Sequence, residues 1–167
     1  MAKSMMAINE DSKKVRIPRK PKVKESDLLV IFDDLNRAYF GGMVYGGIGW
    51  RFFRIGKKDF TLATCEMTER FIRVSNVLED RRIPVWFLKF VVYHEMIHLY
   101  LGPQQFDRAG YSYPHNSRFK LIEQRHSDYE KAVNFELTKL PRIIESWRAW
   151  RSYVKQRDQE KNKSKVR

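Results

Sequence analysis

Apolar residues recur at helical spacing in the segment 26–40, which predicts an amphipathic helix with one face on a core. These residues are Leu28, Phe32, Leu35 and Tyr39. Ser26 is expected to cap the start of this helix, and Gly41-Gly42 to end it. Three short β-prone segments follow at 47–55, 60–67 and 71–75. They predict a small antiparallel sheet, which must pack on helices because two or three strands cannot bury a core alone.

The segment 84–102 is strongly apolar and predicts a single helix packed on that sheet. Pro84 suits the first turn, since its missing N–H would have no partner there, and Gly102-Pro103 is a stop signal. The ionisable residues Lys89, His94, Glu95 and His98 interrupt the apolar run. A membrane span of about 18 apolar residues is therefore excluded for this helix.

His94 and His98 lie four residues apart, so both imidazoles project from one face of the helix and can reach one metal ion. With Glu95 they form the H-E-x-x-H pattern typical of zinc hydrolases. We interpret Glu95 as the general base that takes a proton from zinc-bound water and later passes it to the leaving amine. The pattern also occurs in helices that bind nothing, but here a metal would offset the cost of burying three ionisable groups.

Catalytic zinc takes three protein ligands, so a third ligand is expected downstream. Leu101 and Gln104 stand where the metzincin pattern requires glycine and histidine, which excludes that arrangement. His115 is the favoured ligand because it follows the turn at Tyr113-Pro114 and stands at the start of a predicted helix. The alternatives are His126, Glu123 and Glu130.

Two further helical regions are predicted, one starting near 115–117 and one spanning 128–155 with a break at Pro141. Apolar residues at helical spacing in the second are Ile143, Ile144, Trp147, Trp150 and Val154. The segment 147–153, W-R-A-W-R-S-Y, has the composition of surfaces that stack bases. Core packing of its tryptophans is favoured, with the arginines outside, and fraying is expected beyond Gln156.

The net charge of +13 is concentrated at the two ends of the chain. Residues 1–24 and 142–167 each carry a net charge of +6, which leaves +1 for residues 25–141. Basic ends on a nearly neutral body suggest a nucleic-acid partner, because Lys and Arg release counterions from phosphates. The alternative is that the charged ends only keep the protein soluble.

The length of 167 residues and the hydrophobic fraction of 43% suit one globular domain. The single cysteine, Cys65, excludes an intramolecular disulfide and a zinc ribbon and fits a reducing compartment. No secretory leader is recognised, so a cytoplasmic location is expected.

Several segments resemble the SprT-like zinc metallopeptidases, which include the Spartan-type proteases of DNA–protein crosslinks. The segments are F-D-D-L-N-R-A-Y-F-G-G (32–42), I-G-W (48–50), I-R-V-S-N-V-L (72–78), V-V-Y-H-E-M-I-H-L-Y-L-G (91–102) and P-H-N-S-R-F (114–119). The resemblance covers about residues 28–125 and implies a zincin-like α+β fold. It also implies zinc on His94, His98 and His115, Glu95 as general base, and peptide-bond hydrolysis that DNA stimulates in the better-known members.

We therefore expect a flexible basic arm at 1–25, a SprT-like metallopeptidase domain at 26–155 and a basic tail at 156–167. The predicted protein is a monomeric zinc endopeptidase that acts on protein substrates, with DNA-associated proteins as a candidate class. Nucleic acid would bind the tails, and no membrane is involved. One alternative is a nucleic-acid-binding protein with a structural or vestigial zinc site, and another is a zinc hydrolase of a non-peptide bond.

Residues around His115 are candidates for supporting roles in catalysis, although an ordinary surface or packing role is favoured for each possible oxyanion donor. An oxyanion needs a hydrogen-bond donor close to it. The candidates for this donor are Tyr111, Tyr113 and Arg118. Asp107 is a candidate for a carboxylate that orients a ligand histidine.

Overall fold

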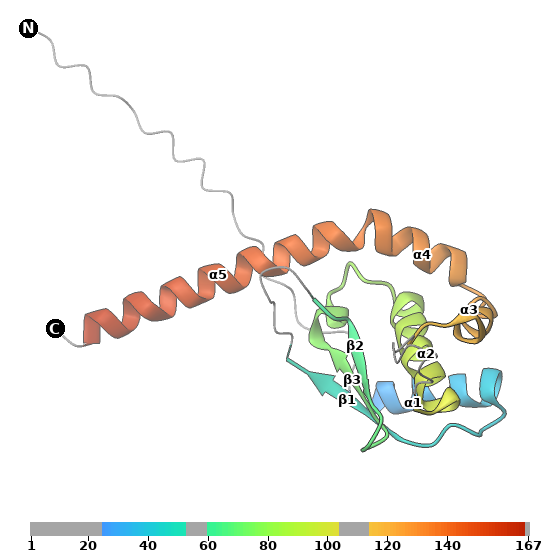
Figure 1. The fold of residues 1–167 in the computed structure, drawn as a ribbon. Coiled ribbons are helices and arrows are strands. Elements are labelled where there is room, and N and C mark those ends of the chain that lie inside the picture. Colours follow the sequence, from blue (N-terminus) through green and yellow to red (C-terminus); the bar gives the residue numbers. More distant parts are fainter. Residues whose placement is uncertain (1–24, 53–59, 104–113, 166–167) are drawn as a thin grey trace, which may run out of the picture.

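A small sheet and the helix that follows it form the centre of the fold (Figure 1). The computed structural model describes residues 25–52, 60–103 and 114–165, so the predicted arm at 1–25 lies almost wholly outside it. The elements in chain order are α1 (Glu25–Phe40), β1 (Gly47–Arg51), β2 (Ala63–Glu66), β3 (Phe71–Ser75), the 3-10 helix η1 (Asn76–Glu79), α2 (Val85–Leu101), α3 (Ser117–Glu123), α4 (Tyr129–Thr138) and α5 (Leu140–Lys165). The expected α+β class is confirmed.

The sheet is mixed, which corrects the expectation of an antiparallel sheet. Strand β3 lies in the centre, antiparallel to β2 and parallel to β1. A tight turn joins β2 to β3, as in a hairpin, whereas β1 and β3 are connected through the whole stretch 52–70. The expectation was wrong because an antiparallel sheet of three successive strands needs β1 beside β2, whereas β1 lies beside β3 and runs parallel to it.

Two of the three strands are shorter than predicted. Strand β1 ends at Arg51, and residues 53–55 of the predicted segment lie outside the described part of the chain. Strand β2 covers only Ala63–Glu66 of the segment 60–67, while β3 has the predicted bounds.

Helix α2 has the predicted limits and is buried on most sides. Pro84 is its N-cap, and the N–H of Gly102, with φ of 78°, donates to the carbonyl oxygen of His98 at 3.1 Å. The helix contacts α1, α3 and α4 as well as β2 and β3. None of the helices in the described ranges combines the length and the apolar character needed to cross a lipid bilayer.

The turn between β2 and β3 fastens the sheet to the end of α2. Arg70 in this turn adopts a φ of 50°. Its guanidinium donates to the carbonyl oxygen of Tyr45 at 3.0 Å and to that of Leu99 at 3.3 Å. Because the last carbonyls of a helix have no partner within the helix, Arg70 satisfies one of them and stabilises this end of α2.

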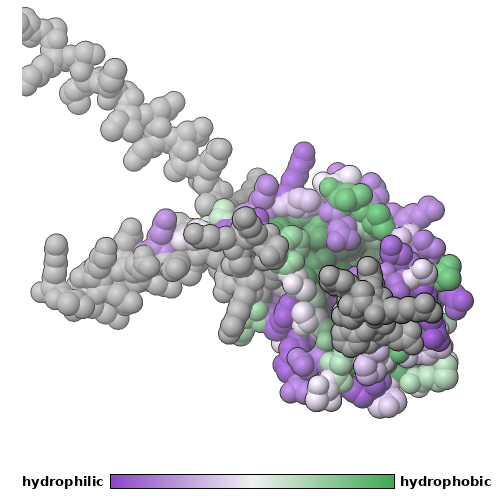
Figure 2. Space-filling view, viewed as in Figure 1, coloured by the Kyte–Doolittle hydropathy of each residue, from purple (hydrophilic) through white to green (hydrophobic). Residues whose placement is uncertain are grey.

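Helix α1 buries the face predicted from its apolar spacing. Leu28, Phe32 and Leu35 are buried, and Tyr39 is half-buried against the core. The helix begins at Glu25, so Ser26 lies inside it, and the expectation that Ser26 is the N-cap was wrong. Figure 2 shows that hydrophilic residues cover most of the visible face of the body, with hydrophobic residues in smaller areas between them.

The C-terminal helices are separated near the predicted break. Helix α4 ends at Thr138, and Pro141 is the second residue of α5, where its missing N–H costs no hydrogen bond. Ile143, Ile144 and Trp147 are buried, as predicted. Helix α5 continues to Lys165 instead of fraying beyond Gln156, and its outer half extends away from the body (Figure 1).

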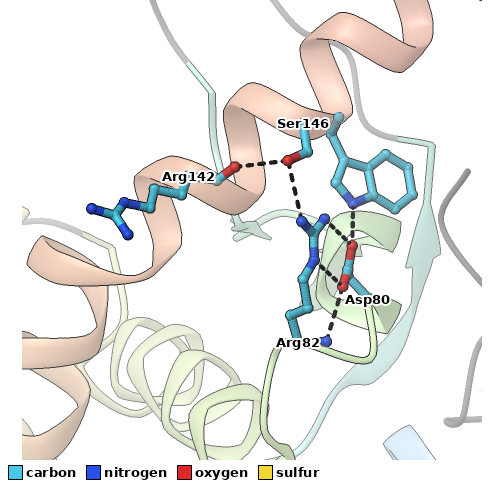
Figure 3. A network of polar contacts seen from close by, with 5 residues as sticks. Asp80, Arg82, Arg142 and Ser146 are labelled. Carbon is cyan, nitrogen blue, oxygen red and sulfur yellow. Dashed lines mark hydrogen bonds and ion pairs between the residues drawn. The ribbon is translucent and has the colours of Figure 1, made fainter. Parts of the chain in front are cut away.

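A polar network joins α5 to the turn that precedes α2 (Figure 3). Asp80, only 6% exposed, accepts hydrogen bonds from the Arg82 guanidinium at 2.7 and 2.9 Å and from the indole N–H of Trp147 at 2.8 Å. Arg82 also donates to the hydroxyl of Ser146 at 3.1 Å, and this hydroxyl donates to the carbonyl oxygen of Arg142 at 2.9 Å. Trp147 therefore belongs to the core and is not free to stack on a base.

Two opposing effects set the ionisation of Asp80. Burial raises the pKa of its carboxyl, but the hydrogen bonds from Arg82 and Trp147 outweigh burial and leave the pKa below its ordinary value. The carboxylate therefore stabilises the fold above a pH of about 4, and this contribution is lost as the pH falls through the folded-state pKa.

We expect Asp80→Asn to lower the free energy of unfolding by about 1–3 kcal/mol, because an amide N–H₂ would face a buried donor. Urea denaturation measures this effect. Asp34→Asn is the control, since the ion pair of Asp34 with Arg37 is exposed and should be worth less than about 1 kcal/mol. Below a pH of about 4 the wild type should lose stability more steeply than Asp80→Asn, and equal slopes would contradict the role of the carboxylate.

Candidate metal centre

The structure brings together the three histidines predicted as ligands. His94 and His98 lie one turn apart on α2, and His115 lies in the turn before α3. The Nε2 atom of His115 is 3.1 Å from that of His94 and 3.2 Å from that of His98. One ligand atom from each ring lies within 4.8 Å of the others, so the cluster could hold a metal ion.

The spacing of the nitrogen atoms fits a tetrahedral metal ion. Zinc–nitrogen bonds of about 2.0–2.1 Å would place two ligand nitrogens about 3.3 Å apart. The observed distances of 3.1 and 3.2 Å are close to this value. Three ligands of this kind leave one of four positions for water or substrate.

The surroundings of the cluster favour neutral imidazoles, which are the form that binds metal. Burial, together with the charges of the neighbouring His94 and His115, lowers the pKa of His98 to about 4. Burial also lowers the pKa of His115, with a smaller contribution from His94. The two rings therefore present lone pairs at neutral pH.

Phe119 on α3 packs against all three imidazoles. Its side chain is fully buried, and its ring centroid lies 4.8 Å from that of His94, 4.7 Å from that of His98 and 4.6 Å from that of His115. Phe119 ends the segment 114–119 that carries the family resemblance, but no role was predicted for it. The signal available was its position four residues after His115.

Glu123 lies on the opposite side of His94 from the cluster. Its Oε1 atom is 2.6 Å from Nδ1 of His94, whereas Nε2 of the same ring faces His115. In the structure, Glu123 therefore contacts a ligand histidine from behind and does not take the place of one. Asp107, the carboxylate expected to orient a ligand, lies outside the described residues.

Glu95 is buried beside the cluster, with 8% of its surface exposed. Burial raises the pKa of Glu95 to about 6, although the charges of His94 and Arg51 act in the opposite direction. A carboxyl group with a pKa near neutrality can both accept and release a proton at physiological pH.

The cluster opens on a cleft of about 320 Å³. The lining residues from α2, its C-cap and the turn before α3 are the three histidines, Glu95, Gly102 and Pro114. The others are Thr61, Met67 and three residues of β2, an edge strand of the sheet: Ala63, Thr64 and Cys65. Burial raises the pKa of the Cys65 thiol to about 12, so it stays protonated at neutral pH.

The remaining candidate residues lie elsewhere. His126 is buried, its ring is stacked on Tyr39 with centroids 5.2 Å apart, and its Nδ1 accepts the backbone N–H of Asp128 at 3.1 Å. Glu130 and Arg118 are exposed, and neither lines the cleft. Tyr111 and Tyr113 fall in the part of the chain that the structure does not describe.

The comparison with protein families identifies one match. The model of the SprT-like family matches residues 28–139, about two thirds of the chain. This range contains most of α1, the sheet, α2 and the three clustered histidines. No curated protein and no solved structure matches the chain significantly.

We expect the cluster to bind one divalent ion per chain. His115→Ala should weaken the affinity for Zn²⁺ by more than about 100-fold, because even partners behind the ligands are worth 10–100-fold. His126→Phe is the matched control, since it keeps an aromatic ring on Tyr39 and should bind the metal as the wild type does. Competition with a chromophoric chelator measures both affinities, and the reverse order would identify His126 as the ligand.

Proposed function

The chain belongs to the SprT-like family, and from this membership we propose that it is a zinc-dependent endopeptidase. The observation that carries the proposal is the convergence of three Nε2 atoms beside a buried glutamate on one cleft. His94, His98 and His115 would hold the ion, and the reaction would be hydrolysis of a peptide bond.

The three histidines and Glu95 would have different roles in the hydrolysis. Zinc bound by the three imidazoles would supply a Lewis acid for the scissile carbonyl and lower the pKa of a water molecule. Glu95 would take a proton from the attacking water and deliver it to the leaving amine. Its raised pKa of about 6 suits this exchange.

The edge strand β2 offers a place for the substrate. Among the described residues β2 pairs only with β3, so its other edge is free to pair. An extended peptide that added to this edge would be held by backbone hydrogen bonds and would run along the cleft that the histidines line. The β2 residues that line the cleft, Ala63, Thr64 and Cys65, are uncharged, so contacts with them would not select strongly for charged side chains.

We expect Glu95→Gln to lower the rate of peptide hydrolysis by about 10²–10⁴-fold, the usual contribution of a general base. Zinc affinity should stay within about threefold of the wild type, because Glu95 lies next to the ligands without being one of them. Cleavage of casein and self-cleavage by the zinc-loaded protein are the measurements. Glu130→Gln, at an exposed position away from the cleft, should cleave normally, and activity retained in Glu95→Gln would remove Glu95 from the role.

We also propose that the basic ends bind nucleic acid and direct the peptidase to proteins on DNA. The charge distribution supports this, since residues 142–167 carry a net charge of +6 and most of them belong to α5. The outer half of α5 extends beyond the body (Figure 1). A polyanion bound there would not compete with a peptide on β2.

Binding of labelled single-stranded DNA at several salt concentrations tests the role of α5. Each phosphate contact contributes about −0.7 to the slope of log K against log salt. Replacing Lys161, Lys163 and Lys165 with Gln should reduce the slope by up to about 2 and leave DNA-free casein cleavage unchanged. A cleavage rate that does not change when DNA is added would contradict the proposed role of nucleic acid. Salt-sensitive DNA binding without any cleavage would instead favour a nucleic-acid-binding protein with a structural metal.

A further inference from the structure

We propose that Glu123 is a positioning residue that holds His94 in the orientation and tautomer needed for metal binding. The inference rests on the zinc site of the proposed function but does not depend on peptide hydrolysis. It starts from the 2.6 Å distance between Oε1 of Glu123 and Nδ1 of His94. Such a short contact needs a proton on Nδ1, because a carboxylate oxygen can only accept.

The position of that proton decides what the other nitrogen of His94 can do. A neutral imidazole carries one N–H, so a proton on Nδ1 leaves a lone pair on Nε2. Nε2 is the atom that faces His115, at 3.1 Å from its Nε2. Glu123 therefore selects the tautomer in which His94 offers a lone pair to the centre of the cluster. A carboxylate behind the ring also raises the basicity of a ligand histidine.

The contact is held by a second hydrogen bond directly beside it. The hydroxyl of Tyr93 donates to the carbonyl oxygen of Ile122 at 2.6 Å. Tyr93 precedes His94 on α2, and Ile122 precedes Glu123 on α3, so two consecutive residues of each helix face each other. This pair of bonds fixes the position of the end of α3 along α2.

The start of α3 is fixed as well. The side chain of Asn116 caps the helix by accepting the N–H of Phe119 at 2.9 Å, and the ring of Phe119 is buried against the three imidazoles. The side chain of Glu123 is only 17% exposed and that of His94 26% exposed. Solvent therefore competes little with this bond, so the short helix α3 carries both a packing residue and an orienting carboxylate for the cluster.

Two variants of Glu123 test the proposal through the affinity for Zn²⁺. Glu123→Ala, which removes the acceptor, should weaken zinc binding by about 10–100-fold. Glu123→Gln keeps the size and an acceptor oxygen and should fall between the wild type and Glu123→Ala. Glu130→Ala is the matched control, at an exposed glutamate in the first turn of α4, and should bind zinc like the wild type. Competition with a chromophoric chelator supplies all four affinities.

A nitrogen-15 measurement separates positioning from a merely structural role. In the zinc-loaded wild type, long-range correlations of His94 should show a protonated Nδ1 and a metal-bound Nε2, and the Nδ1 proton should exchange slowly. That protection should be lost in Glu123→Ala, while the melting temperature of metal-free Glu123→Gln stays close to that of the metal-free wild type. If Glu123→Ala does not fold, the reduced zinc affinity of Glu123→Gln supports the proposal.

Equal zinc affinities for the wild type and both Glu123 variants would overturn the inference, as would an unprotonated Nδ1 in the zinc-loaded wild type. A carboxylate oxygen of Glu123 bound to zinc in the wild type, seen by X-ray absorption, would also overturn it in favour of direct coordination. Failure of the proposed peptidase function would give a different result. The wild type would then bind zinc without cleaving any substrate, and the zinc affinities of the Glu123 variants would still differ from that of the wild type.

Discussion

The burial of ionisable groups on an apolar helix is the constraint on which the rest of this structure depends. Helix α2 is surrounded by α1, α3, α4 and two strands, and ten of its residues are buried. His94, Glu95 and His98 interrupt this apolar surface, and isolated polar groups there would be costly. Two features reduce this cost. One side of α2 faces a cleft, and His115 and Glu123 provide polar partners for His94.

The parts of the fold that were predictable have local signals. Pro84 and Gly102 mark the ends of α2, and the spacing of His94 and His98 is a property of a single helix. His115 was favoured over His126 from the turn before it, and the structure brings His115 to the cluster while His126 is stacked in the core. Such features need only a few consecutive residues to be recognised.

The parts that were not predictable depend on contacts between distant segments. Strand β1 pairs in parallel with β3, although β2 lies between them in the sequence. Periodicity along the chain does not indicate which strands pair. The residue type of Glu123 allows it to be a metal ligand, but which side of His94 it reaches depends on how α3 lies along α2. The bond from Trp147 to Asp80 likewise joins residues 67 positions apart.

Helix α5 continues as a helix beyond the residues that hold it to the body. Its first turns are held to the body by buried apolar residues and by the bond from Trp147 to Asp80, and residues 151–165 continue as helix. At 1.5 Å per residue, this outer part spans about 22 Å. Asp80 lies only a few residues before the start of α2, so a load on the far end of α5 would be transmitted to the base of the helix that carries the histidines. A flexible tail of the same composition would transmit no such torque.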